Sequence, residues 1–477
     1  MKHYKDPATK PSVIDGDNLS EGQQSLPRSP RKTARFAAIE TLCRLQRNPL
    51  PVPLLFEELA EECALIGQDR HLAMNLIYGV LRQRQYLDNC LGLFCRQPLK
   101  KLHPFVHQAL AVGLYQLLFL DRIPESAAVN ETVNALKIVR LPERLQGFAN
   151  GVLRASIRQR HQIPAPETLD KGGLPVLNHP AWLTDRWEQH FGREEMNRIC
   201  AWNNIQPPLV LRVNPLAINT DDFCARLQEE NITARAGTHA PSAVILPDYH
   251  GPVHDLPGFT EGFFQVQDES AQLVSLLLAP FVLGGHLLDG CAGLGGKTGH
   301  ILELAADVQA TVTAVEPDPR RLRQLGENLT RLHPQKSVRI HPGTLLDFSK
   351  VCTTRFHAIL IDAPCSGTGV IRRHPDIRWN RQAADLPEYR KTQRQLLDLA
   401  AVLLLSGGIL VYATCSLEPE ENSEVVTDFL KEHPDFNLSD CAPFLPVTVR
   451  QFVHNGFFQP HPTESADGFF AARLVRQ

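Results

Sequence analysis

Short apolar runs alternate with amphipathic segments through the carboxyl-terminal half of the sequence. This alternation limits the possible fold classes more than any other feature. Strands are predicted at 286–290, 311–317, 337–341, 356–364 and 407–415, and helices at 267–279, 297–306, 319–332, 388–404 and 419–433. Such alternation is typical of a mostly parallel sheet with helices on both faces, whose ligands bind at the carboxyl ends of the strands. We therefore predict a Rossmann-like α/β domain over 261–477.

The preceding residues predict three further parts. Residues 31–165 repeat apolar side chains at spacings of three and four, as in ARFAAIETLCRL and HQALAVGLYQLLFL, which indicates an all-helical domain. Residues 176–260 combine helical periodicity with the short β-like runs PLVLRVN and SAVILP, which favours a small α+β domain. Residues 1–30 have almost no large apolar side chains and are expected to form a disordered tail, and 162–175 are expected to form a linker.

Composition limits the cellular setting of the protein. Its 11 cysteines include no CxxC pair, and its first residues lack the apolar segment of a secretory signal. These features favour reduced thiols in the cytoplasm over disulfides or a zinc site. No apolar run reaches the roughly 18 residues of a membrane span. We expect a soluble, cytoplasmic monomer with no metal and no membrane partner.

The net charge of -3 hides an uneven distribution. Residues 31–160 contain 18 Lys and Arg against 11 Asp and Glu, whereas the rest of the chain contains 31 against 41. A basic helical region joined to an acidic remainder fits a nucleic-acid-binding module attached to a second function. A solvated helical surface explains the same charge equally well.

A glycine-rich loop follows the strand predicted at 286–290 and opens a helix, where backbone N–H groups meet ligands closely. Its candidate cofactor-binding residues are Cys291, Ala292, Gly293, Leu294, Gly295, Gly296 and Lys297. A phosphate-binding P-loop needs glycine where Cys291 stands, and a dinucleotide loop needs a third glycine where Thr298 stands. S-adenosylmethionine needs only close backbone approach and a carboxylate for its ribose, which Glu316 at the next strand end supplies. Asp318 in the same turn is expected to cap a helix.

Two cysteines follow the last two predicted parallel strands, Cys365 in DAPCS and Cys415 in ATCS. Together with the CAGLGGK loop, these motifs resemble those of the RNA cytosine-C5 methyltransferases of the Nol/Nop/Sun family. The resemblance covers the whole carboxyl-terminal half. It implies S-adenosylmethionine as cofactor, with Cys415 as nucleophile, Asp362 in contact with base and cofactor, and Cys365 assisting product release. Cytosine C5 is a weak nucleophile, so a thiolate must first add to C6.

Two points qualify this resemblance. The DNA cytosine methyltransferases attack from a Pro-Cys motif, which here would be Cys365, and the presence of Cys415 is what favours RNA. The family usually has Asp after its third strand to hold the adenosine region of the cofactor. Thr344 stands at the matching position here, and Asp347 is the candidate replacement.

Basic and aromatic side chains gather after Cys365 in GVIRRHPDIRWN, a mixture suited to phosphate contacts and base stacking. The candidates for RNA contact are Arg372, Arg373, His374, Arg378 and Trp379; a solvated loop is the alternative. This segment, FQVQDESAQ and DGFFAARL resemble the bacterial small-subunit rRNA members of the family. The amino-terminal helices resemble the NusB-like domain of those members, with Arg31, Lys32 and Arg35 as further candidate RNA contacts.

The resemblance implies a cytosine in 16S rRNA as the substrate, with position 967 expected. Methylation of another rRNA or tRNA cytosine is one alternative, because the catalytic motifs do not name the target. A non-catalytic RNA-binding assembly factor is the other. The retention of both Cys365 and Cys415 argues against it.

Overall fold

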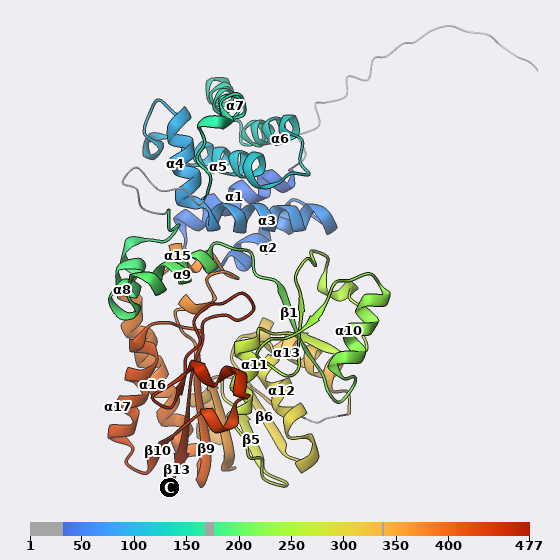
Figure 1. The fold of residues 1–477 in the computed structure, drawn as a ribbon, viewed down its shortest axis with the longest axis vertical. Helices are drawn as coiled ribbons and strands as arrows, with labels where there is room; N and C mark the ends of the chain where they lie inside the picture. Colours follow the sequence, from blue (N-terminus) through green and yellow to red (C-terminus); the bar gives the residue numbers. More distant parts are fainter. Residues whose placement is uncertain (1–31, 167–175, 336–337) are drawn as a thin grey trace, which may run out of the picture.

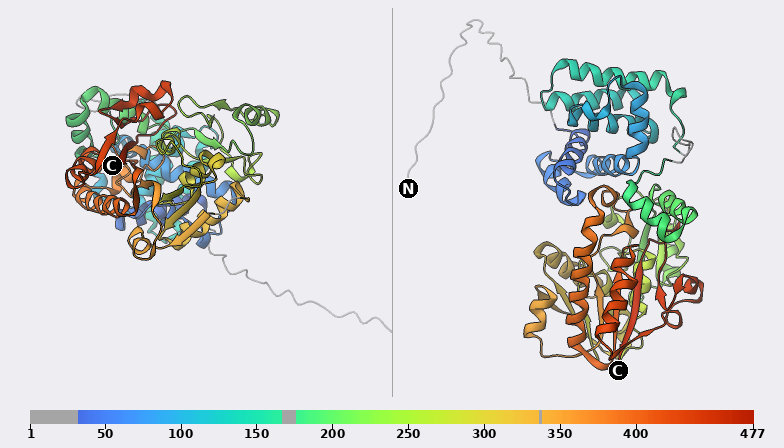
Figure 2. Two further views of the ribbon diagram at one scale, coloured as in Figure 1. Left: turned by 90° about the horizontal axis from the view of Figure 1, so that it is seen from below. Right: turned by 90° about the vertical axis from the view of Figure 1, so that its left-hand side faces the viewer.

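A computed structural model describes residues 32–166, 176–335 and 338–477. The predicted tail, Arg31 and most of the predicted linker lie outside these described residues. A helical domain stacks against one end of a larger body that contains two sheets (Figure 1), and a view at right angles shows the same stacking (Figure 2). In the described part of the chain, no helix is long and apolar enough to cross a membrane.

The amino-terminal domain is helical, as predicted. Its helices are α1 (Ala34–Arg47), α2 (Val52–Glu62), α3 (Gly67–Arg82), α4 (Arg84–Phe94), α5 (Pro104–Phe119), α6 (Glu125–Ile138) and α7 (Glu143–Arg158). Helix α5 is apolar on nearly all sides and packs against α1, α3, α4, α6 and α7. A helix that is apolar all round is stable only when its neighbours cover it, so α5 forms the centre of this domain.

A small antiparallel sheet follows, with strands β1 (Leu209–Val213), β2 (Arg235–Ala236), β3 (Ala243–Leu246) and β4 (Phe264–Val266) in the order β2-β3-β1-β4. Helix α10 (Thr220–Glu229) packs on it through Phe223 and Leu227. Because β4 pairs with β1, this sheet continues past the predicted end at residue 260. Helices α8 (Ala181–Phe191) and α9 (Arg193–Asn203) pack elsewhere, against Ile371 and Leu417 of the carboxyl-terminal domain.

The large sheet has the order β11-β12-β13-β9-β8-β5-β6-β7, and β10 pairs with β13. Its strands are β5 (His286–Asp289), β6 (Thr311–Glu316), β7 (Val338–Pro342), β8 (Phe356–Asp362), β9 (Leu404–Thr414), β10 (Phe436–Ser439), β11 (Val453–His454), β12 (Phe457–Phe458) and β13 (Phe470–Arg476). Strands β5 to β9 are parallel to one another, which confirms the predicted mostly parallel sheet. The antiparallel strands β10 to β13 were not predicted.

Helices cover both faces of this sheet. They are α11 (Glu269–Leu276), α12 (Gly296–Leu304) and α13 (Pro319–Leu332) over one apolar cluster, and α14 (Leu345–Val351), α16 (Leu386–Leu403) and α17 (Ser423–Glu432) over the other. The chain ends just after β13, at the end of the sheet away from the helical domain (Figure 1). Since β13 runs antiparallel to β9, the parallel strands end toward the helical domain. Their carboxyl ends therefore face the junction of the domains.

A buried ion pair ties the small sheet to helix α12. The guanidinium of Arg212 in β1 is completely buried and donates to both carboxylate oxygens of Glu303, at 3.0 and 2.8 Å. It also donates to the carbonyl of Gly296, at the start of the helix. The pairing lowers the pKa of the Glu303 carboxyl, although burial opposes this. Loss of either partner would leave an uncompensated buried charge.

We predict that Arg212→Ala lowers the free energy of unfolding by roughly 3–5 kcal/mol, since Glu303 then stays buried without its partner. The matched control is Arg226→Ala, which removes an exposed pair with Glu261 and is expected to cost less than about 1 kcal/mol. Urea unfolding followed by circular dichroism measures both. Equal losses in the two variants would contradict this role of Arg212.

Candidate active site

Two thiols meet where strands β8 and β9 end. These strands are adjacent and in register, with Asp362 opposite Ala413. The turns that follow place the Sγ atoms of Cys365 and Cys415 3.3 Å apart. The hydrogen bond to Cys415 and burial raise the pKa of the Cys365 thiol well above its ordinary value. Cys365 therefore keeps its proton and can donate it to the sulfur of Cys415 in a hydrogen bond.

A buried carboxylate, Glu421, holds both cysteine turns. It accepts hydrogen bonds from the backbone N–H of Ser366 at 2.8 Å, from the Ser366 hydroxyl, and from the Ser416 hydroxyl at 2.5 Å. Gln393 donates to the same carboxylate at 3.1 Å. Burial raises the pKa of the Glu421 carboxyl, and these hydrogen bonds oppose the rise. The sequence analysis missed Glu421; a serine after each cysteine was the available signal that a shared acceptor lies beneath them.

Lys297 and Asp362 form an ion pair beside the thiols. The ammonium of Lys297 donates to Oδ2 of Asp362 at 2.6 Å and lies 5.1 Å from the centre of the Phe469 ring. The Asp362 side chain keeps 31% of its exposure, so the carboxylate remains open to a ligand. The pair joins the glycine-rich loop to the turn that carries Cys365. The structure thus brings together predicted residues from three separate motifs.

The glycine-rich loop lies next to Glu316. The backbone N–H of Gly293 donates to one carboxylate oxygen of Glu316 at 2.9 Å, and that of Asp318 donates to the other at 2.8 Å. Each oxygen keeps a further lone pair for a ligand hydroxyl. Gly295 has φ +86° and is the N-cap of α12, and a side chain at Gly293 would meet open space. Asp318 caps α13, as predicted.

Asp289, at the end of β5, is fully buried beneath this loop. It accepts hydrogen bonds from the Thr298 hydroxyl at 2.7 Å and from the N–H of Cys291 at 3.4 Å. Burial raises the pKa of its carboxyl to about 6, despite the Thr298 hydrogen bond. Asp289 therefore links the strand end to both ends of the loop. Among the described residues, no group of three or more His, Cys, Asp or Glu side chains is arranged to hold a metal ion.

Thr344 and Asp347 cap a helix. Thr344 is the N-cap of α14, and its hydroxyl accepts from the backbone N–H of Asp347 at 3.1 Å. The Asp347 carboxylate in turn accepts from the N–H and hydroxyl of Thr344. The side chain of Asp347 is exposed and committed to this capping box. It thus has a structural task in addition to the predicted contact with a cofactor.

Two of the predicted RNA contacts are buried inside the protein. Arg378 is 0% exposed and donates to the carbonyls of Asn178 and Asn203 at 2.9 and 2.6 Å. Arg372 is 1% exposed and pairs with Asp467. Because these guanidiniums are enclosed by protein acceptors, they cannot reach a phosphate in this conformation, which contradicts the prediction for both. The sequence around Arg372 and Arg378 is polar and basic, and nothing in it indicated that these two side chains are buried.

The remaining residues of that segment lie nearer the surface. Arg373 is half-buried and pairs with Asp268 at 2.9 Å and with Asp467. The indole N–H of Trp379 donates to the carbonyl of Leu81 in α3 at 2.7 Å, so this side chain binds the helical domain. His374 is exposed. Arg373 also donates to the carbonyl of Pro208 in the small domain at 3.2 Å. Among these described residues, His374 alone has a side chain with no hydrogen bond or ion pair to another domain.

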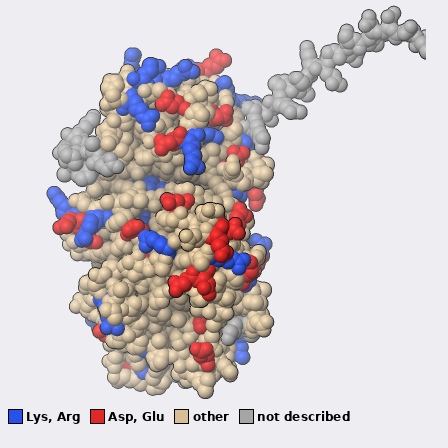
Figure 3. All heavy atoms as spheres, turned by 45° about the vertical axis from the view of Figure 1, so that its right-hand side comes forward, with Lys and Arg blue, Asp and Glu red and all other residues tan. Residues whose placement is uncertain are grey.

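The predicted contacts on the helical domain also have protein partners. The Lys32 ammonium lies 3.6 Å from Glu62, and Arg35 donates to the side chain of Gln116 in α5 at 3.0 Å. Arg31 lies outside the described residues. The surface of this domain shows Lys and Arg side chains gathered at its top, whereas Asp and Glu form clusters on the body below (Figure 3).

Comparisons with known proteins identify the family. Residues 276–475 match the family described as 16S rRNA methyltransferase RsmB/F, residues 32–158 the NusB family, and residues 179–253 a ferredoxin-like domain of RsmF/B-like methyltransferases. The chain is 41% identical over 411 residues to ribosomal RNA small subunit methyltransferase B of Escherichia coli O6:K15:H31, covering 86% of this chain and 91% of that protein. The chain belongs to the RsmB/F family of 16S rRNA methyltransferases.

Further relatives agree with this RsmB/F assignment. The small subunit methyltransferase B of Shigella flexneri is 40% identical over 412 residues, with 86% of this chain and 91% of that protein covered. The crystal structure of PH0851 shares the fold with a TM-score of 0.71 at 23% identity, covering 93% of this chain and 98% of the other. A methyltransferase homologue from Pyrococcus horikoshii has a TM-score of 0.53 at 28% identity, over 63% of this chain and 96% of that one.

We predict that Glu421→Gln slows rRNA methylation by roughly a hundredfold, because an amide cannot accept from all the donors that hold the two turns, and a small misplacement of reacting groups is costly. The turnover number is expected to fall while the KM for RNA stays unchanged, which separates positioning from general instability. Glu424→Gln, at an exposed glutamate paired with Arg390, is the matched control. A raised KM with normal turnover would contradict the positioning role.

Asp289→Asn tests the buried carboxyl through pH. Because burial raises the pKa of Asp289 to about 6, the folded protein holds a proton that the unfolded chain releases near pH 4. Wild-type stability therefore falls as the pH rises from about 4 to about 6. Over this window the stability of the variant relative to wild type is expected to rise by up to about 3 kcal/mol, and above about pH 6 the difference stays at that level. Urea unfolding at several pH values checks this, and a constant difference would refute the shift.

Proposed function

We propose that this protein methylates C5 of a cytosine in 16S rRNA, at position 967, through a covalent bond between Cys415 and C6. The carrying observation is the 3.3 Å contact between the two sulfur atoms beside the Lys297–Asp362 pair. Similarity to small subunit methyltransferases B over 86% of the chain supports the rRNA substrate. Thiolate addition makes C5 nucleophilic enough to accept a methyl group.

S-adenosylmethionine fits the residues at the end of the sheet. Glu316 would accept hydrogen bonds from the ribose hydroxyls, and the open space at Gly293 would admit the ligand close to the backbone. Asp362 would lie between the cofactor and the base. When bound, the cofactor supplies an electrophilic methyl group. Family membership supports this assignment.

The residues of this chain divide the reaction between them. The Cys415 thiolate forms a bond to C6 while N3 takes up a proton, for which the Lys297–Asp362 pair is the donor. C5 would then take the methyl group as the bond between that group and the sulfonium sulfur breaks, which leaves the cofactor as a neutral thioether. In the last step the C5–H bond breaks and its proton passes to water, its electrons restore the C5–C6 double bond, the sulfur leaves C6, and N3 returns its proton to the Lys297–Asp362 pair. The protonated Cys365 stabilises the departing thiolate with a hydrogen bond.

We predict that Cys415→Ala abolishes methylation, because the neighbouring thiol, Cys365, keeps its proton and is a poor nucleophile in that state. Cys365→Ala is expected to accumulate a covalent protein–RNA adduct, since thiolate departure loses its hydrogen-bond donor. Each variant is incubated with 16S rRNA and S-adenosylmethionine and run on a denaturing gel. Cys224→Ala, at a half-buried thiol of the small domain, serves as the matched control and should behave as wild type. An adduct trapped by Cys415→Ala instead would reverse the two roles.

The target base is tested separately from the chemistry. Bisulfite sequencing of 16S rRNA from cells that lack this protein should show loss of the methylcytosine signal at position 967. Restoration by the wild-type protein, but not by Cys415→Ala, would assign the signal to this enzyme. A normal signal at 967 would refute the target, and loss at another cytosine would name the correct one.

A further inference from the structure

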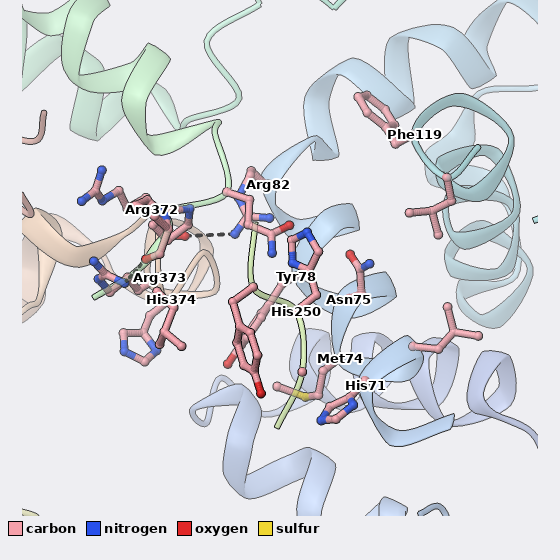
Figure 4. A pocket seen from close by; sticks show the side chains of 18 of the residues that line it. His71, Met74, Asn75, Tyr78, Arg82, Phe119, His250, Arg372, Arg373 and His374 are labelled. Carbon is pink, nitrogen blue, oxygen red and sulfur yellow. Dashed lines mark hydrogen bonds between the residues drawn. The ribbon is translucent and has the colours of Figure 1, made fainter. Parts of the chain in front are cut away.

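A cavity of about 780 Å³ lies where the helical domain, the small sheet and the loop after Cys365 meet. One face of helix α3 forms a wall, with His71, Asn75, Tyr78 and Arg82 spaced so that they point the same way. Arg373 and His374 stand on the opposite side (Figure 4). His71 and Asn75 are exposed, so the cavity is open to solvent. Its volume is in the range that binds small organic groups, about 300–1,000 Å³.

Aromatic rings line this cavity from three separate elements. Tyr78 comes from α3, Tyr115 and Phe119 from α5, and Tyr249 from the small domain. Tyr115 and Phe119 are stacked on each other, with ring centres 5.1 Å apart and planes 19° apart. The Tyr115 ring is buried, whereas Tyr78, Phe119 and Tyr249 are half-buried and line the cavity. Planar bases cover such partly exposed rings by stacking.

Arg82 supplies a buried positive charge at the wall. It is 7% exposed, and one guanidinium nitrogen donates to the carbonyl of Arg372 at 3.0 Å. Its Nε is buried without a hydrogen-bond partner, and within the described ranges no carboxylate forms an ion pair with it. Burial lowers the pKa of its guanidinium. A buried cation without a counter-ion is costly, and an anionic or electron-rich ligand in the cavity would offset the cost.

We propose that this cavity binds unpaired nucleotides of the RNA substrate, stacking a base on the aromatic walls and drawing its phosphate toward Arg82. The proposal rests on the RNA methylation proposed above and names a second contact for that substrate. The loop that lines the cavity with Arg373 and His374 begins at Cys365, so the same loop serves the thiols and the cavity. Enzymes that modify a base extrude it from a duplex or act on a single-stranded segment, and in a single-stranded segment the neighbours of the target are unpaired. The cavity provides these neighbours with a binding site.

Tyr78 allows a direct test of stacking, because one substitution at this position removes the aromatic ring and another retains it. Tyr78→Leu is expected to weaken the binding of a short unpaired RNA of mixed sequence by roughly tenfold, since one stacking face is lost. Tyr78→Phe keeps the ring and should bind within about twofold of wild type. Fluorescence anisotropy of the labelled RNA measures both, and unfolding midpoints report any loss of fold. Equal affinity of both variants and wild type would overturn the proposal.

Added negative charge gives a second test that leaves the core untouched. The exposed double variant His71→Glu with Asn75→Asp should bind the same RNA about tenfold more weakly by repelling its phosphates. The matched control, Asn89→Asp with Asn130→Asp, adds the same charge at exposed sites of α4 and α6 outside the cavity and should bind as wild type. Equal weakening in both would show that charge acts at long range and would overturn the cavity site.

Cross-linking separates this proposal from the proposed function. Unpaired RNA that contains 4-thiouridine is irradiated with the full-length protein, and peptides are mapped by mass spectrometry. Cross-links in α3 or near His250 are expected whichever cytosine is methylated. Cross-links only at other places would show that RNA does not bind in the cavity. That result would overturn the cavity proposal and would not affect the proposed methylation. If the wild-type protein cross-links in the cavity but does not methylate 16S rRNA, the proposed function alone would be refuted.

Discussion

The buried carboxylate of Glu421 is the interaction on which the reactive centre depends. Adjacent parallel strands bring two turns to one edge of the sheet, but strand pairing ends before Cys365 and Cys415. Beyond that point, the turns are joined through donors of Ser366 and Ser416 that share this one acceptor. Burying a carboxylate costs several kcal/mol unless it is hydrogen-bonded, and here a backbone amide, two hydroxyls and a side-chain amide satisfy it. The contact between the sulfur atoms follows from that arrangement.

The loop that starts at Cys365 connects this centre to every other domain. Within its own domain, Arg372 and Arg373 pair with Asp268, before α11, and Asp467, before β13. Five residues further along, Arg378 donates to backbone carbonyls before α8 and in α9. The indole of Trp379 donates to the carbonyl of Leu81 in the helical domain. Guanidinium groups suit this task because several N–H groups can bind separate acceptors in a fixed plane. Movement of the helical domain would therefore pull on the same segment that positions Cys365.

The sequence predicted the fold class and the residues of the reactive edge, but not the polar contacts behind them. Strand alternation is encoded locally, so the places of Glu316, Asp362 and Cys415 at strand ends followed from pattern alone. Glu421 and Asp467 lie far in sequence from several of their partners, and periodicity carries no signal for such contacts. The prediction that Arg372 and Arg378 contact RNA was wrong for the same reason, because the acceptors that enclose them are distant in sequence. A basic loop has the same composition whether phosphates or buried carboxylates neutralise it.

The burial of Arg372 and Arg378 also changes where RNA binding is expected on this protein. With these cations enclosed, a positive charge without a carboxylate partner remains at Arg82, on the wall of the cavity between the domains. The carboxyl ends of the parallel strands face the same junction (Figure 1). In the binding mode proposed above, a strand of RNA that enters there would meet both the aromatic cavity and the paired thiols. The helical domain would then act through the alignment of the substrate rather than through its net charge.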